Sequence, residues 1–304
     1  MEIENINEAW DDFITNDDND AIDSSPDKPS YVEDIVETNV SATLKKKVIP
    51  KCGELHISTK TKIAHLNQAI DLNEIFWKLS VNEFYMPKCG IIKKQMKISC
   101  SNKKELEELL DKIKSEKRLV NQNILSHIDK PDGRVKFKDV RKINIGISKK
   151  DIESYRSKIK SAFYNCFVLI IRIKYENEFR ELHVKIFNTG QLEIPGIKTD
   201  DMFEDVMDVV LEKMQPFVSS ILDYDRDKTE TILYNSNFNC GFYINRDKFY
   251  NLLKYKYKIQ AIYDPCSYPG IQCKFYYNYD KGTDDLNTGI KMNETDKKIS
   301  FMIF

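Results

Sequence analysis

The sequence predicts an α+β protein in which an antiparallel sheet carries helices on one of its faces. The main evidence is the segment from Phe163 to Phe217, which has the pattern of three strands joined as a meander and followed by one amphipathic helix. In these strands apolar residues alternate with polar ones, so each strand offers one face to a core and the other to solvent or a ligand. Parts of the same pattern recur later in the chain, which indicates a duplicated architecture.

The middle strand of this meander shows the alternation most clearly. Leu182, Val184 and Ile186 form an aliphatic face. The residues between and beside them on the other face are Glu181, His183, Lys185 and Phe187. After this strand, Asn188-Thr189-Gly190 predicts a tight turn because glycine tolerates a positive φ. We expect the return strand to end at Pro195-Gly196, and a helix over residues 201–217, capped by Thr199, to cover the aliphatic face.

The composition indicates a protein without a membrane segment. Of 304 residues, 41% are hydrophobic and 31% charged, with a mean hydropathy of -0.51. No apolar run approaches the roughly 20 residues that a membrane helix needs, and the acidic N-terminus does not have the pattern of a secretory signal. The seven cysteines include no CxxC pair, so we expect reduced thiols, no metal site and no cofactor in an intracellular protein.

Charge divides the chain. Residues 1–40 contain thirteen acidic side chains and one basic side chain, whereas residues 93–160 contain twenty basic and ten acidic side chains. Lysine outnumbers arginine by 39 to 8. The N-terminal composition is typical of a disordered tail, because too few apolar residues are present to offset the entropy of ordering, and the central excess of lysine and arginine predicts a basic surface.

These patterns define three parts of the chain. We expect a disordered acidic tail at residues 1–48, a first repeat at residues 49–222 that carries a basic insertion at about 101–160, and a second repeat at residues 223–304 that is incomplete at its C-terminal end. The further elements expected are strands near 53–63, 90–98, 140–147, 231–233 and 270–277, and helices at 72–79, 104–118 and 244–253.

The internal repeat is visible in short motifs. Tyr85-x-Pro87 followed by Gly90-Ile91-x-x-Lys94 parallels Tyr263-x-Pro265 followed by Gly270-Ile271-x-x-Lys274, and ISFMIF at residues 299–304 parallels LHVKIF at residues 182–187. Two copies of this size predict two pseudo-symmetric halves rather than a solenoid.

Four stretches resemble the TATA-binding protein family, and most closely the TATA-binding-protein-like factors of large DNA viruses. KIFNTGQLEIPGIK at 185–198 is similar to the family's strand and hairpin motif LIF-x-SGK-x-x-x-TGAK, and YDPCSYPGIQCKF at 263–275 to its motif YEP-x-x-FPG-x-x-YRM. IRI at 171–173 is similar to its MRI, and FMIF at 301–304 to its second LIF. With the helices, the resemblance covers about residues 53–98 and 163–304.

The resemblance implies a saddle, in which one curved, duplicated antiparallel sheet has helices on its convex face and a free concave face that binds the DNA minor groove. Proteins of this kind insert apolar side chains between base steps and bend the duplex. The residues that match DNA-contacting positions of the family are Phe187, Phe304, Tyr268, Phe167, Lys185, Arg172, Lys274, Lys94 and Asn235. For the position given to Phe167, Cys166 and the region of residues 88–89 are alternatives. Leu55 replaces the second asparagine, and Glu193 and Pro195 depart from the hairpin motif; a carboxylate facing phosphates is unfavourable.

The implied function is that of a transcription-initiation factor that binds A+T-rich double-stranded promoter DNA, together with a transcription factor IIB-like factor and RNA polymerase. If the protein is viral, its site of action would be the virus factory in the host cytoplasm, the virion or the host nucleus. The acidic tail either imitates DNA and inhibits the concave face or serves only solubility. A protein-protein scaffold is the alternative function. Catalysis is not expected, because the sequence contains no evident nucleophile and base pair or cluster of carboxylates.

Overall fold

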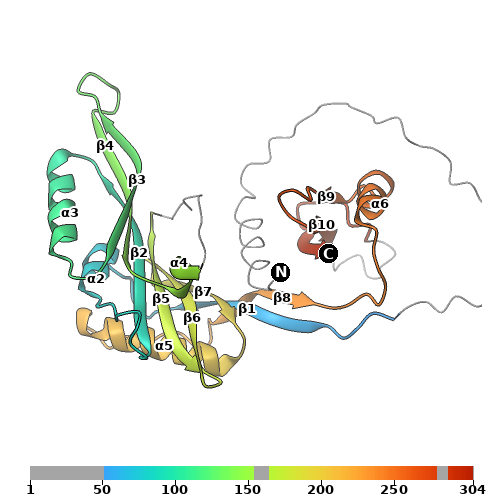
Figure 1. Cartoon of the computed structure of the whole chain (residues 1–304), viewed down its shortest axis with the longest axis horizontal. Coiled ribbons are helices and arrows are strands. Elements are labelled where there is room, and N and C mark those ends of the chain that lie inside the picture. The colour runs from blue at the N-terminus through green and yellow to red at the C-terminus, as the bar shows by residue number, and fades with distance from the viewer. Residues whose placement is uncertain (1–50, 154–163, 279–286, 304) are drawn as a thin grey trace, which may run out of the picture. The chain divides into compact units, whose positions relative to one another are not determined.

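The computed structural model describes residues 51–153, 164–278 and 287–303 and divides into two units (Figure 1). The larger unit is Glu54–Phe238, and the described part of the smaller unit comprises residues 51–53, 239–278 and 287–303. The expected α+β class is confirmed, because the larger unit is built on an eight-stranded antiparallel sheet with few helices. The acidic tail expected to be disordered and Phe304 lie outside the described residues.

The elements of the larger unit are β1 (His56–His65), α2 (Leu72–Lys78), β2 (Gly90–Cys100), α3 (Lys103–Ser115), β3 (Val120–Asp129), β4 (Phe137–Gly146), α4 (Lys149–Glu153), β5 (Cys166–Tyr175), β6 (Glu178–Phe187), β7 (Gln191–Ile197), α5 (Asp200–Met214), the 3-10 turn Gln215–Phe217 and β8 (Glu230–Asn237). The strand order in the sheet is β3-β4-β2-β5-β6-β7-β1-β8. No helix in the described part of the chain is long and apolar enough to cross a bilayer.

The hairpin of β5 and β6 forms the centre of the sheet. The two strands pair in continuous register from Cys166 opposite Phe187 to Tyr175 opposite Glu178. Their two-residue turn, Glu176 and Asn177, has positive φ at both positions (51° and 64°), which matches the twist of the flanking strands. The predicted meander is therefore confirmed from β5 to β7.

The aliphatic face of β6 packs against helices, as expected. Leu182, Val184 and Ile186 are buried in one core with Phe76 of α2 and Phe203 of α5. The remaining apolar stripe of α5 that joins this core is Met202, Val206, Met207, Val210 and Met214. The Thr199 hydroxyl accepts a hydrogen bond from the Met202 N–H, so the predicted helix cap is also confirmed.

The return strand β7 does not end at Pro195-Gly196. The pairs between β1 and β7 step from Lys62–Ile194 to Lys60–Ile197, so β7 contains one residue more than β1 at this point. Gly196 has a φ of 85°, which is compatible with a β-bulge. The proline and glycine are therefore accommodated inside the strand, and the expectation of a strand end here is wrong.

The insertion adds two strands to the sheet edge. β4 pairs with β2, and β3 pairs with β4, so the hairpin extends the same sheet. The expected helix appears as α3, with its Leu109 buried, and the expected turn lies at residues 130–133, where the Gly133 N–H donates to the Lys130 carbonyl. β3 was not expected from the sequence.

The smaller unit contains a three-stranded antiparallel sheet in the order β11-β10-β9. Its elements are α6 (Arg246–Asn251), the π turn Leu252–Lys256, β9 (Gln260–Ile262), β10 (Ile271–Tyr277) and β11 (Lys297–Ile303). Leu253, Ile259, Ile271 and Cys273 form its small core. The strand β8, expected to open the second repeat, belongs to the larger unit because it pairs with β1.

Candidate nucleic-acid interface

The face of the large sheet opposite the core with α2 and α5 is the candidate interface, and we call it the open face. The strand registers place on it Cys166, Val168, Ile170 and Arg172 of β5, Glu181, His183, Lys185 and Phe187 of β6, Gln191 and Glu193 of β7, Thr59, Thr61 and Ile63 of β1, and Leu233 and Asn235 of β8. The assignment follows from strand geometry, because residues directly opposite each other on paired strands share a face.

Phe187 lies on the open face at the end of β6, where it is half-buried. Its cross-strand partner on β5 is Cys166. Phe167, by contrast, points to the helix side, is fully buried, and has its ring centroid 6.1 Å from that of Phe76. The assignment of Phe167 as a DNA wedge is therefore corrected: the open-face residue at this register is Cys166.

Lys185 and Glu193 form an ion pair across β6 and β7. The Lys185 Nζ lies 2.6 Å from the Glu193 Oε1, and the two side chains are 25% and 26% exposed. The carboxylate that departs from the family motif thus has a cation beside it on the same face. An ion pair at this exposure removes the net charge from the site, so neither side chain offers an isolated charge to a ligand.

Asn235 lies on the open face where the sheet passes from β1 to β8. Its side-chain amide donates to the Thr59 hydroxyl at 3.1 Å, and its backbone carbonyl accepts a hydrogen bond from the Ser58 hydroxyl. The side chain is half-buried. Asn235 therefore occupies a polar position on this face.

Arg172 is not exposed to a ligand. The guanidinium donates to the backbone carbonyls of Phe84 and Met86 at 2.8 and 3.2 Å and to the Glu181 carboxylate at 3.0 Å. Only 6% of Arg172 is exposed. The side chain therefore fixes the loop before β2, and its assignment as a phosphate contact is corrected for this structure.

Lys94 lies on the helix side of β2 and is 1% exposed. Its Nζ donates to the carbonyls of Phe76 and Leu79 at 2.8 and 2.7 Å, which places a cation at the C-terminal end of α2. Burial lowers the pKa of Lys94 to about 8, and the nearby Glu116 carboxylate opposes this shift. Its assignment as a DNA contact is also corrected, because the ammonium is enclosed by protein.

The remaining candidates belong to the smaller unit. The Tyr268 hydroxyl donates to the Met302 sulfur, and burial raises the pKa of Tyr268 to about 12. Lys274 is 7% exposed on β10, between Gln260 and Ser300 on the adjacent strands.

The open face is partly covered by α4, which the sequence analysis did not include. The Asp151 carboxylate lies 2.6 Å from the Lys93 Nζ and accepts hydrogen bonds from the Ser148 N–H and hydroxyl. The Lys149 N–H donates to Glu181 on β6. In Figure 1, α4 lies on the side of the sheet away from α2 and α5. The expectation of a free face is therefore wrong near β2, β5 and β6.

The sequence did contain a signal for α4. The tetrapeptide Ser148-Lys149-Lys150-Asp151 matches a helix capping box, in which a first serine and a fourth acidic residue cap each other. Close to α4, burial lowers the pKa of His183 to about 4, with Lys150 and Lys93 contributing in the same direction. His183 is therefore neutral at physiological pH and adds a hydrogen-bonding group rather than a charge to the open face.

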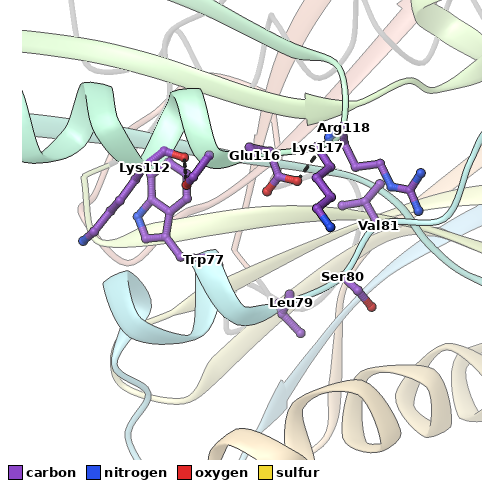
Figure 2. Close-up of a pocket in the computed structure, with 9 residues that line it drawn as sticks. Trp77, Leu79, Ser80, Val81, Lys112, Glu116, Lys117 and Arg118 are labelled. Atoms are coloured by element: carbon purple, nitrogen blue, oxygen red, sulfur yellow. Dashed lines mark hydrogen bonds between the residues drawn. The ribbon is translucent and has the colours of Figure 1, made fainter.

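A cavity of about 520 Å³ lies on the helix side, between the C-terminal ends of α2 and α3. Figure 2 shows the Trp77 indole beside Lys112 on one side of it and the Glu116, Lys117 and Arg118 side chains on the other. Because this cavity is on the helix side, it is not part of the open face. Within the described residues, no group of three or more histidine, cysteine or acidic side chains is arranged to hold a metal ion.

Neither a scan against protein-family models nor a search of curated proteins gives a match for this chain. The quoted motifs therefore remain the basis of the family resemblance.

Proposed function

We propose that this chain is a transcription-initiation factor similar to the TATA-binding protein, which binds A+T-rich promoter DNA in the minor groove through the open face and bends it. The observation that carries the proposal is the make-up of that face. A half-buried aromatic, Phe187, and a polar centre at Asn235 lie on one face of an antiparallel sheet whose other face is covered by helices. Minor-groove proteins read DNA with such amide groups and unstack base steps with such apolar wedges.

The pairing of β1 with β8 supports a duplicated, saddle-shaped sheet. Each of these strands precedes the first helix of its half, α2 or α6, and the two pair in antiparallel orientation. Two copies of one unit related by a two-fold axis perpendicular to a shared sheet must meet through antiparallel copies of the same strand. The β1 and β8 ladder has this arrangement.

A second pair of strands supports the correspondence between the halves. β6, which carries the KIF motif, pairs with β5, and β11, which carries the FMI residues of the second motif, pairs with β10. In this correspondence β10 is equivalent to β5. The registers offset the two cations that the family motifs align, because Arg172 is opposite Glu181, six residues before Phe187, and Lys274 is opposite Ser300, four residues before Phe304. The alternative equivalence of β10 with β2, taken from the Gly90 and Gly270 motifs, has less support because β5 separates β2 from β6.

The proposed mechanism places Phe187 between two base steps while backbone phosphates are held by lysines at the sheet. Unstacking costs a few kcal/mol per step and is repaid by the larger contact area of a bent duplex. The helix side would remain accessible to a transcription factor IIB-like factor and to RNA polymerase.

The alternative function is a protein-protein scaffold that uses the same sheet. Two observations favour it: α4 lies over part of the open face, and Lys185 pairs with Glu193 rather than standing as an isolated cation. This function predicts weak DNA binding that depends little on salt, since few phosphate counterions would be released.

The proposal is tested by measuring binding to A+T-rich and G+C-rich duplexes across a salt series, with fluorescence transfer between the duplex ends to report bending. The variants are Phe187→Ala and, as a matched control, Tyr234→Ala. Tyr234 is also aromatic, is 54% exposed, and pairs with Lys60 on the helix-side register of β1. We expect wild type and Tyr234→Ala to bend DNA and Phe187→Ala to bind without bending.

Equal bending by all three proteins would show that Phe187 is not a wedge. Weak binding without bending by the wild type would contradict promoter binding and favour the scaffold function.

A further inference from the structure

We propose that α4 is a strap across the open face, and that its Asp151 carboxylate occupies the position on Lys93 that a backbone phosphate takes when DNA binds. The proposal assigns Lys93 as a phosphate-binding residue and Asp151 as the group that competes with DNA for it. It rests on the proposed function and deepens it, because it names one contact to the duplex and the way in which that contact is regulated.

The strand register places Lys93 on the open face. Lys93 of β2 is opposite Ile170 of β5, and Ile170 is opposite His183 of β6. Residues directly opposite each other share a face, so these three form one row across adjacent strands. Ile170 is nevertheless only 1% exposed. This row of the open face is therefore covered in the structure.

α4 is attached on both sides of the row by polar contacts. On β2, the Lys93 Nζ donates to the two Asp151 carboxylate oxygens at 2.6 and 2.7 Å. On β6, the Glu181 carboxylate accepts a hydrogen bond from the Lys149 N–H at 2.8 Å. Because β5 lies between β2 and β6 in the sheet, these contacts tie α4 across three strands, on the side where Figure 1 shows it.

Little apolar burial holds the strap in place. α4 has five residues, none of which is buried, and its one aliphatic side chain, Ile152, is 63% exposed. A helix of this length is not stable by itself. Segments with few buried apolar contacts open at a low cost in free energy. In the described part of the chain, the strap is therefore held mainly by its polar contacts.

The Lys93 ammonium suits a phosphate in the place of Asp151. It already holds an anionic group through two oxygens, and a phosphate also offers two oxygens to one ammonium. Burial acts to raise the pKa of Asp151, but hydrogen bonds from Lys93 and Ser148 hold this pKa below its ordinary value, so Asp151 is an anion at neutral pH. The carboxylate and a phosphate therefore compete for the same ammonium.

The neighbouring cations of the open face are neutralised by acidic residues of the sheet itself. Lys185 pairs with Glu193 at 2.6 Å, and Arg172 pairs with Glu181 at 3.0 Å. Lys93 differs from them, because its carboxylate belongs to the strap and leaves with it. Duplex DNA carries one negative charge per about 1.7 Å of its axis, so it is a strong competitor for Lys93. DNA binding and opening of the strap are thereby coupled.

The test measures the affinity of the full chain for an A+T-rich duplex across about 50 to 200 mM salt. The variants are Asp151→Asn, Lys93→Met and the double variant Lys93→Met/Asp151→Asn. The matched control is Asp129→Asn, which removes the same charge from another lysine pair. Asp129 lies 2.7 Å from Lys103 of α3 and is 38% exposed, whereas Asp151 lies 2.6 Å from Lys93 and is 40% exposed.

We expect Asp151→Asn to bind the duplex about tenfold more tightly than the wild type, because one charge-assisted hydrogen bond no longer holds the strap closed. Asp129→Asn should match the wild type. In the Lys93→Met background, Asp151→Asn should have no effect, because the two anions then have no shared ammonium. The salt slope of Lys93→Met should be smaller by about 1 than that of Asp151→Asn.

Hydrogen exchange of the Lys149 amide gives a second readout that requires no variant. This N–H donates to Glu181 in the closed strap. We expect its exchange to become faster when the wild-type protein binds the duplex, because the strap then leaves β6. Slower exchange would show that DNA binds over the closed strap, and would overturn the inference.

Two results of the binding experiment would also overturn it while leaving the proposed function standing. One is equal affinity of wild type and Asp151→Asn for a duplex that both proteins bend. The other is the same gain from Asp151→Asn with and without Lys93, which would show general repulsion of DNA instead of competition for one ammonium. If wild type, Asp151→Asn and Asp129→Asn all fail to bind the duplex, the proposed function is overturned as well, so the two failures are distinguishable.

Discussion

Replacement of Lys94 by methionine tests whether this lysine is part of the core or of the proposed DNA interface. Methionine has a similar length and is apolar, so it fills the space of the buried stem without an ammonium group. In the structure the ammonium is enclosed and donates to the Phe76 and Leu79 carbonyls. We expect Lys94→Met to change the pH dependence of folding and to leave DNA binding unchanged.

The magnitude follows from the pKa of Lys94, which burial lowers from 10.5 to about 8. Between these two values the unfolded chain keeps a proton that the native protein has released, so the free energy of unfolding rises with pH in this interval. Below pH 8 the lysine is protonated in both states and contributes no slope. Between pH 7.5 and 9.5 the expected gain is about 2 kcal/mol, and Lys94→Met should lack it.

The assay is urea unfolding followed by tryptophan fluorescence in a Trp10→Phe background, because Trp77 is then the single remaining tryptophan and lies in the larger unit. The difference in unfolding free energy between wild type and Lys94→Met should move by about 2 kcal/mol in favour of wild type from pH 7.5 to 9.5. A difference that is independent of pH would refute the assignment of a buried, desolvated ammonium. A salt slope for DNA binding that falls by about 1 in Lys94→Met would instead make Lys94 a phosphate contact.

Two further predictions concern the frame of the open face. Gly190 and Gly196 both have a positive φ, 86° and 85°, but an added Cβ would lie 2.4 Å from the Gln68 carbonyl oxygen at Gly190 and 3.6 Å from its nearest neighbour at Gly196. Gly190→Ala should therefore lower the unfolding free energy by about 1–3 kcal/mol more than Gly196→Ala. Equal losses in urea unfolding would refute this prediction. Burial acts to raise the pKa of Asp139, but hydrogen bonds from Arg141 and His127 hold this pKa below its ordinary value. The Asp139 carboxylate therefore stabilises the native state at neutral pH, and this stabilisation is lost as pH falls through the native pKa. Asp139→Asn should cost about 3 kcal/mol at pH 7 and progressively less in acid; a cost that does not change with pH would contradict the charged network.

The alternation of β6 and the stripe of α5 were predictable because they are local periodicities. Leu182, Val184 and Ile186 alternate strictly, and the helix stripe begins directly after a capping Thr199. In both cases the buried face is determined by residues within one element. For the same reason the sequence identified Phe187 and Lys185 as open-face residues.

The faces of Lys93 and Lys94 were not predictable in this way. The pairs between β2 and β5 step from Ile91–Ile171 to Lys93–Ile170, so a bulge at this point changes which residues of β2 share a face. Without the bulge, Ile91 and Lys93 would lie on one side and Lys94 on the open face. The bulge turns Lys94 toward the helices and Lys93 toward α4. A sequence pattern carries no sign of such a shift, because it depends on the partner strand.

β3 escaped prediction for a related reason. Its sequence, VNQNILSHID, does not alternate strictly, because its apolar residues stand at positions 120, 124, 125 and 128 and the strand pairing shifts between Ile124 and Ser126. Strand propensity is weak where neither face is fully buried. The segment was therefore expected to be part of an irregular insertion.

The Lys185 and Glu193 pair offsets the departure from the family motif at Glu193. An isolated Glu193 would repel the phosphates of a bound duplex, but with Lys185 at 2.6 Å the pair is neutral and the repulsion is largely cancelled. The cancellation also removes Lys185 as a source of affinity, and Arg172 and Lys94 are engaged inside the protein. If DNA binds the open face, its electrostatic attraction must come from other cations in the sheet.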